Sequence, residues 1–256
     1  MAFEIINPEG DPRFLFLCDH ASNALPDRYG DLGLGADQLQ RHIAWDIGAG
    51  EVVRHLSEAF HAPAVLGIYS RLLIDLNREP VDPTLIMQIS DGAIIPGNRV
   101  IDDEEREHRI KTYFEPYHQA VTAEVDRALK AGKVPLLVSV HSFTESWKGV
   151  KRPWHIGLLW DRDGRAVKPL EEILGRNDNL VVGDNEPYSG ELRGDCLYTH
   201  GTKRGLPHVL IEIRQDLISD PASTKAWAQL LEDALRELLL HEHIWTVEHI
   251  GSHADT

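Results

Sequence analysis

The chain has 256 residues, of which 42% are hydrophobic, and this size and composition predict one soluble domain over residues 1–256 with a substantial core. Its formal net charge of -15 at pH 7 excludes the basic footprint of a nucleic-acid-binding protein and disfavours contact with anionic membranes. Only two cysteines, an N-terminus without a signal-peptide pattern and no apolar run of membrane-spanning length together predict a cytoplasmic protein with no membrane partner.

Six apolar runs, separated by amphipathic segments, give the predicted order of elements. The runs are typical of strands buried on both faces, and they cover residues 13–20, 62–76, 135–143, 154–161, 179–187 and 208–216. Apolar residues spaced three or four apart predict helices within residues 36–60, 102–132, 165–176 and 223–243. This alternation predicts an α/β fold, with a mostly parallel sheet and helices on both of its faces.

Two segments interrupt this pattern. Residues 77–103 hold several prolines and glycines and show little periodicity, which predicts a loop-rich excursion over one edge of the sheet. The tail from about residue 250 is expected to be frayed. No repeat, linker or break in composition divides the rest of the chain, so one domain is the simplest interpretation.

Ionisable residues stand where three of the predicted strands end. His20 follows the first strand, His141 closes the third, and Glu212 lies near the end of the last. Open α/β sheets place their sites at the carboxyl edge. A hydrolytic zinc site needs two or three nitrogen or oxygen ligands, an open position for water and a carboxylate nearby as general base. These three side chains supply such a set if their strands are neighbours.

Structural interpretations compete with this one. The two histidines are also explained as buried side chains that hydrogen-bond to the backbone. Glu212 would cost several kcal/mol to bury without a partner, but Arg214 lies on the same face of the strand and is a candidate partner for it. Asp46 lies at the start of a helix or within it, where an acid can simply favour the first turn.

A second polar group follows the second predicted strand and contains Arg71, Asp75, Asn77 and Arg78. Guanidinium groups bind carboxylates through two parallel hydrogen bonds, and an amide beside them can orient a substrate carboxylate or stabilise an oxyanion. The competing interpretation is an ordinary ion pair between Arg71 and Asp75 on the surface.

Five segments carry a resemblance to a known family in their order and spacing. They read CDHASNALP, HIAWDIGA, SRLLIDLNRE, VSVHSFT and HVLIEIRQD. Together they resemble the N-formylglutamate amidohydrolase family, and the resemblance extends from about residue 12 to about residue 240. It implies a zinc carboxypeptidase-like (phosphorylase/hydrolase-like) fold, in which a mixed, mostly parallel sheet carries a metal ion at its carboxyl edge.

The resemblance also implies ligands for one zinc ion per chain. His20 and His141 match zinc ligands of the family. In the carboxypeptidase pattern a glutamate ligand stands three residues after the first histidine, where this chain has Asn23. Because an amide oxygen is a poorer zinc ligand than a carboxylate, Asp46 is expected to be the third ligand. Asn23 is the alternative ligand, or else a contact to the substrate.

Roles in catalysis and substrate binding follow from the same resemblance. Glu212 matches the general base of the related peptidases, and Asn77 with Arg78 resembles the pair that holds the substrate carboxylate. Arg71 is expected to support the oxyanion and Arg214 to contact the substrate. Because the chain is acidic, arginines at positions 71, 78, 193 and 214 would have to create a local positive field for an anionic substrate.

The implied reaction is metal-dependent hydrolysis of the amide bond in a small-molecule N-acyl amino acid. The family name points to N-formyl-L-glutamate, which would give formate and glutamate. The sequence leaves two alternative functions open. One is a metallo-amidase or peptidase for short peptides of the cell-wall type, and the other is a non-catalytic relative that binds an amino acid, which the departure at Asn23 motivates.

Overall fold

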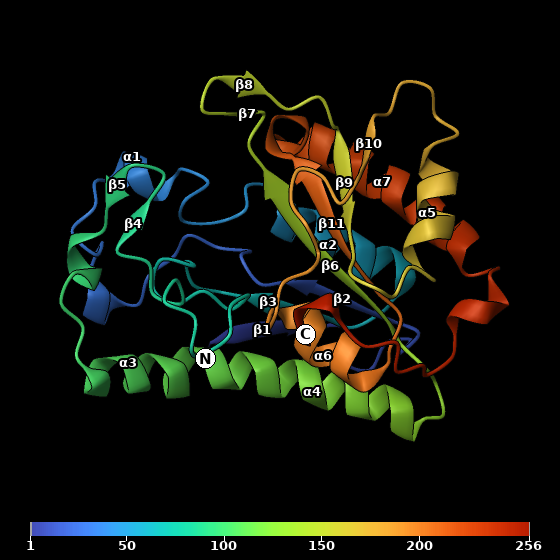
Figure 1. Ribbon diagram of the computed structural model, residues 1–256, viewed down its shortest axis with the longest axis horizontal. Coiled ribbons are helices and arrows are strands. Elements are labelled where there is room, and N and C mark those ends of the chain that lie inside the picture. The colour runs from blue at the N-terminus through green and yellow to red at the C-terminus, as the bar shows by residue number, and fades with distance from the viewer. Residues whose placement is uncertain (1, 256) are drawn as a thin grey trace.

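The computed structural model describes residues 2–255 and places seven strands of this range in one sheet between two layers of helices (Figure 1). In spatial order the strands are β1 (Phe3–Ile6), β3 (Ala64–Gly67), β2 (Phe14–Cys18), β6 (Leu136–Phe143), β11 (His208–Arg214), β9 (Ile156–Leu159) and β10 (Val182–Asp184). The pairs β1 with β3 and β9 with β11 are antiparallel, and the other neighbours are parallel. The expected mixed, mostly parallel sheet is therefore confirmed.

All six predicted strands are present, and the sheet gains an edge strand, β1, that the sequence pattern did not predict. Two small hairpins lie outside the sheet. They are formed by β4 (Ile89–Ser90) with β5 (Ala93–Ile94), and by β7 (Ser146–Trp147) with β8 (Val150–Lys151). Figure 1 shows the two hairpins projecting on different sides of the molecule.

Helices cover both faces of the sheet, as expected. One face carries α2 (Ala49–Phe60), α5 (Val167–Leu174) and α7 (Pro221–Leu238), and the other carries α4 (Glu115–Lys130) and the short α6 (Cys196–His200). Helix α3 (Asp103–Arg109) continues through a π-helical turn (Ile110–Phe114) into α4, which gives the long rod along one side of Figure 1. A short helix, α1 (Ala36–Leu39), precedes α2.

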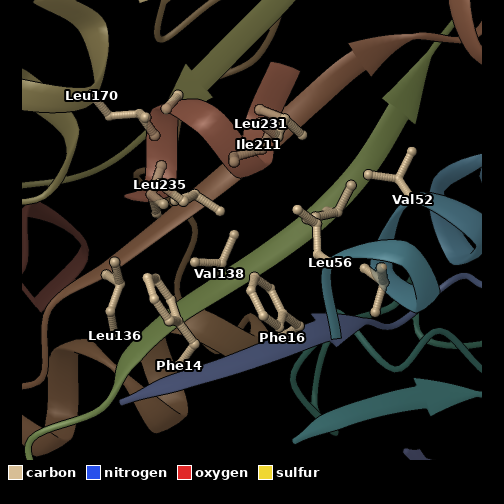
Figure 2. Packing of buried hydrophobic residues seen from close by; sticks show 14 of the residues in the cluster. Phe14, Phe16, Val52, Leu56, Leu136, Val138, Leu170, Ile211, Leu231 and Leu235 are labelled. Carbon is tan, nitrogen blue, oxygen red and sulfur yellow. The ribbon is translucent and has the colours of Figure 1, made fainter. Parts of the chain in front are cut away.

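The core is divided by the sheet because successive side chains of a strand point to opposite faces. Phe14 and Phe16 of β2 pack with Val52 and Leu56 of α2 on one face (Figure 2). Leu15 and Leu17 join the cluster under α4 on the other face. Burying each such side chain stabilises the fold by roughly 1.5–3 kcal/mol. This double-sided burial is why β2 reads as a continuous apolar run.

The helix predicted over residues 36–60 is broken, and the break positions Asp46. Between α1 and α2 the chain turns, and Gly48 adopts a φ of 80°, in the left-handed region. A Cβ atom at Gly48 would lie 2.2 Å from the carbonyl oxygen of Ile218, so this turn requires glycine. Asp46 therefore lies in a turn ahead of α2 and not in a helix, which corrects the expectation for this residue.

The loop-rich excursion over residues 77–103 is held by buried polar side chains. Asn98 donates hydrogen bonds to the carbonyls of Leu72 (2.7 Å) and Met87 (2.8 Å). Its side-chain oxygen accepts from the fully buried Arg109 of α3 (2.8 Å), which also binds the carbonyl of Leu73 (2.9 Å). These hydrogen bonds satisfy buried backbone carbonyls and, together with the buried side chains of Leu85 and Ile95, fix the excursion.

The expected frayed tail is not observed over residues 250–255, and residue 256 lies outside the described range. Ser252 is buried, and the backbone N–H of His253 donates to the carboxylate of Asp161. The tail is thus packed against the loop that follows β9. Within residues 2–255, no helix has the length and apolar character needed to cross a bilayer.

Candidate active site

Four consecutive parallel strands, β3, β2, β6 and β11, bring their carboxyl ends to one edge of the sheet. His20 follows β2, His141 lies in β6, and Glu212 in β11 is the register partner of His141. Asp46 reaches the same edge because its backbone N–H donates to the carbonyl of His20 (2.9 Å). Residues from four separate parts of the sequence therefore meet at one place.

The side chains of His20, Asp46 and His141 converge on a common point. Asp46 Oδ2 lies 2.8 Å from His141 Nδ1 and 3.4 Å from His20 Nδ1. One ligand atom from each residue lies within 4.8 Å of the others, and all three residues are buried. Two imidazoles and a carboxylate are the donor set of a catalytic zinc site that keeps a position open for water.

The opposite nitrogen of each ring faces a second carboxylate. His20 Nε2 lies 2.7 Å from Asp75 Oδ1, and His141 Nε2 lies 3.2 Å from Asp19 Oδ2. The hydroxyl of Tyr117 donates to Asp19 Oδ1. Carboxylates behind metal-binding histidines fix the ring orientation and the tautomer. Here they would keep the proton on Nε2, so that the Nδ1 lone pair of each ring, now facing Asp46, could bind a metal ion.

Electrostatics favour a cation at this point. Burial acts to raise the pKa of Asp19, Asp46 and Asp75, but the two imidazoles, together with Arg71 in the case of Asp75, override it. The pKa of Asp19 falls to about 2, and the pKa values of Asp46 and Asp75 lie well below the usual range. Three buried carboxylates thus face two imidazoles and one guanidinium. Without a metal ion, burial lowers the pKa of both imidazoles but the facing carboxylates raise it further, so protonated rings balance the carboxylates. Metal-binding imidazoles are neutral, and a divalent cation between them would then replace the two lost positive charges.

Glu212 supplies a carboxyl group beside the three candidate ligands. Its Oε2 atom is buried and has no hydrogen-bond partner among the described residues. Burial raises the pKa of Glu212 to about 7, with His141 acting in the opposite direction. An unpartnered buried carboxyl group is costly for the fold, and a pKa near neutrality suits a residue that accepts and returns a proton.

The guanidinium group of Arg71 is bound by two acidic neighbours, Asp75 and Asp46. It donates to Asp75 through Nε (3.1 Å) and Nη2 (2.7 Å), and Nη1 lies 3.5 Å from Asp46 Oδ1. Arg71 and Asp75 therefore do form the ion pair that the sequence suggested, but Asp75 is buried and the pair lies within the site. It links Arg71 to the residues that hold His20.

Asn77 and Arg78 follow on the same loop. Asn77 Oδ1 accepts from the backbone N–H of Cys196 (2.9 Å), which leaves its Nδ2 group as a donor. Arg78 Nη1 donates to the carbonyl of Asn77 (2.9 Å), and the part of the chain that the structure describes gives Arg78 no carboxylate partner. Both residues line the cavity described next.

A cavity of about 550 Å³ opens above these groups. Its floor contains the three candidate ligands and Glu212. Its walls come from three loop segments beyond the sheet: the β4–β5 hairpin, the β7–β8 hairpin and residues 188–192. Aromatic and aliphatic side chains of these loops alternate with polar groups, as is usual in pockets for small molecules.

The structure does not bring Asn23 and Arg214 to this cavity. Asn23 Nδ2 donates to the carbonyl of Leu39 (2.9 Å), so its amide stabilises the turn after α1. Arg214 pairs with Asp216 (2.8 Å) and not with Glu212, because the chain turns away from the sheet at Arg214. Of the two alternatives for a third ligand, Asp46 lies with His20 and His141, and Asn23 does not.

Sequence reasoning did not assign Asp19, Asp75 or Tyr117 to the site. Asp19 and Asp75 stand next to candidate residues, and a histidine near an acid at a strand end was an available signal. Which ring nitrogen each acid faces depends on the packing of three strands, and no local pattern encodes it. Tyr117 reads as an ordinary residue of an amphipathic helix, so nothing in the sequence indicated its role.

Comparisons with known proteins identify a family for this chain and solved structures with a similar fold. The family model described as N-formylglutamate amidohydrolase matches residues 13–219. Among solved structures, the gene product Atu2144 from Agrobacterium tumefaciens is 37% identical with a TM-score of 0.89, and the alignment covers 93% of this chain and 94% of that one. N-formylglutamate amidohydrolase from Ralstonia eutropha JMP134 is 21% identical with a TM-score of 0.71, covering 95% and 98%. No curated protein matches the chain.

Proposed function

Because the chain belongs to the N-formylglutamate amidohydrolase family, we propose that it hydrolyses the amide bond of an N-acyl amino acid with the help of one zinc ion. N-formyl-L-glutamate is the proposed substrate, and formate and glutamate are the products. The observation that carries this proposal is the convergence of His20, Asp46 and His141 beside the unpartnered carboxyl group of Glu212.

Two imidazoles and one carboxylate would hold the metal, backed by Asp75 and Asp19. When bound, a zinc ion would polarise the acyl carbonyl and lower the pKa of water at the site. Glu212 accepts the proton of the attacking water and returns it to the departing amine, so that the amino acid leaves as a neutral amine. Arg71, held by Asp75, adds positive charge near the carbonyl oxygen as negative charge develops there.

Asn77 and Arg78 orient the substrate. The Nδ2 group of Asn77 and the unpaired guanidinium of Arg78 are donors for the α-carboxylate of the amino acid. Asp75 accepts the backbone N–H of Asn77 (2.9 Å) and also faces His20, so the carboxylate-binding loop and the metal site share one support. This connection would hold the scissile bond at a fixed position relative to Glu212.

Zinc-loaded protein is expected to release glutamate and formate from N-formyl-L-glutamate, measured by product chromatography. Removing the metal with a chelator should abolish turnover, and adding zinc back should restore it, because the carbonyl is then polarised again. Turnover that survives complete metal removal would contradict the proposal. Hydrolysis of short cell-wall peptides with none of N-acyl amino acids would favour the amidase alternative, and zinc binding without any turnover would favour a binding protein.

The ionisation of Asp195 is expected to make substrate binding depend on pH. It is buried, lines the cavity and caps α6 by accepting from the backbone N–H of Tyr198 (2.6 Å). Burial raises its pKa to about 7, so Asp195 is neutral below that pH and negative above it. Its charge would repel an anionic substrate, so the KM for N-formyl-L-glutamate should rise as pH increases from 6 to 8, measured by steady-state kinetics across that range.

Asp195→Asn provides the matched control, since asparagine also caps helices and carries no charge. In this variant the rise in KM from pH 6 to 8 should be smaller than in the wild type, and the remaining rise comes from Glu212, whose pKa of about 7 makes it gain charge over the same range. An unchanged pH dependence in Asp195→Asn would show that another group is responsible.

A further inference from the structure

Arg152 directly follows the β7–β8 hairpin and packs against residues that line the cavity. The two-residue turn of the hairpin consists of Lys148 and Gly149, both with positive φ, and the chain then returns to Arg152. Arg152 Nη1 donates to the side-chain oxygen of Thr144 (3.1 Å) and to its carbonyl (3.3 Å). Thr144 and Trp147 of the hairpin region line the cavity, so Arg152 is anchored directly behind its wall.

Three aromatic rings surround this guanidinium. Its central carbon lies 5.0 Å from the ring centre of Tyr188, 5.6 Å from that of Phe143 and 5.7 Å from that of Trp147. All three rings line the cavity. Stacking on rings orients a planar guanidinium and reduces its contact with water without neutralising it.

Arg152 has no carboxylate partner among residues 2–255, although the chain carries 41 acidic residues and 26 basic ones. The arginines near it behave differently. Arg71 is neutralised by Asp75, and Arg214 is neutralised by Asp216. Arg78, on the cavity floor, shares the unpaired state of Arg152. Arg78 thus lines the cavity, and Arg152 lies against three rings of its wall. Neither guanidinium has an acidic partner among the described residues, so each is available to an anionic group.

We propose that Arg152, held by Phe143, Trp147 and Tyr188, binds a second carboxylate of the substrate, the one on the amino-acid side chain, while Arg78 binds the α-carboxylate. The inference rests on the proposed function and names the residue that would select an acidic side chain among N-acyl amino acids. Among the acids that line the cavity, the charge of Asp91 is offset by Arg41 (2.6 Å). The charge that Asp195 carries above neutral pH opposes such a substrate, which makes a cationic partner for the second carboxylate necessary.

The test compares N-formyl-L-glutamate with N-formyl-L-glutamine, which has the same shape and lacks the second charge. Wild-type protein should prefer the glutamate compound by roughly tenfold or more in kcat/KM, since a charge-assisted hydrogen-bond pair is lost with the amide. Arg152→Gln should reduce this preference to near unity, mainly through a higher KM for the glutamate compound. Arg152→Lys keeps the charge and should retain part of the preference.

Arg176→Gln is the matched control. It removes the same charge from an exposed arginine that pairs with Glu237, and the preference should be unchanged. A purely structural Arg152 would affect both substrates equally, so an unchanged ratio in Arg152→Gln would overturn the inference. A wild-type protein that hydrolyses both compounds equally well would overturn it too.

A binding measurement separates this inference from the proposed function. Zinc-loaded wild-type protein and Arg152→Gln are titrated with L-glutamate and with L-glutamine in a calorimeter. If no turnover is found but wild type binds L-glutamate more tightly and Arg152→Gln loses this difference, the amidohydrolase proposal fails and the second carboxylate site stands. Equal binding of both amino acids by wild-type protein would remove the site.

Discussion

Replacing Glu212 with glutamine is expected to lower kcat for amide hydrolysis by about two to four orders of magnitude, the usual contribution of a positioned general base. The amide keeps the shape of the side chain but cannot accept a proton from water. Zinc content should stay at the wild-type level because the three candidate ligands are untouched. The measurements are steady-state kinetics on N-formyl-L-glutamate and elemental analysis of the same preparation.

The stability of the Glu212→Gln variant provides an independent check. Glu212 Oε2 has no hydrogen-bond partner and its pKa is raised to about 7, so the fold gains nothing from the ionised group. The thermal midpoint of the variant should therefore equal or exceed that of the wild type. Glu124→Gln is the control, because Glu124 is also buried but pairs with Arg127 (2.9 Å) outside the cavity, and activity should persist. Full turnover in Glu212→Gln would exclude its assigned role.

Replacing both His20 and His141 with alanine should abolish zinc binding. Wild-type protein purified without chelator is expected to contain about one zinc per chain, and the double variant none, because one carboxylate alone does not hold the ion. Elemental analysis gives the ratio. The control replaces His241 and His243, a histidine pair whose ring centres lie 5.8 Å apart at the end of α7 and which does not line the cavity. That protein should keep its zinc.

The double variant leaves Asp19, Asp46 and Asp75 buried without their imidazole partners. Breaking a buried charge pair typically costs about 3–5 kcal/mol, so the variant is expected to be less stable as well. Asp46→Asn therefore serves as a milder second variant, which keeps the shape of the side chain and should weaken zinc binding in a competition assay with a chelator. Absence of zinc from wild-type protein even after incubation with the metal would return both histidines to a purely structural role.

The sequence predicted the sheet well because buried strands leave a local signal. The run from Phe14 to Cys18 is apolar at every position, and the structure buries both of its faces. The edge strand β1 has a partly exposed, mixed pattern and left no comparable signal. Helix boundaries were less predictable, since the break before α2 depends on a close contact between Gly48 and the distant Ile218.

The candidate site was predictable where it depends on strand ends and not where it depends on side-chain direction. His20, His141 and Glu212 lie at adjacent strand ends, as their positions suggested. Arg214 follows Glu212 by two residues, and strand periodicity placed both on one face. The turn that begins at Arg214 carries its guanidinium to the carbonyls of Arg152 and Trp154 instead.

The number of partners that share the Asp75 carboxylate limits how this protein can change during evolution. One carboxylate receives the His20 ring, the Arg71 guanidinium and the backbone N–H of Asn77, and it therefore serves the metal site, the charge beside the carbonyl and the carboxylate-binding loop at once. Substitutions at positions 20, 71 and 75 should then be strongly epistatic, because each removes a partner of the same group. New substrate preferences would arise more readily in the hairpins at the rim, where side chains can be exchanged singly.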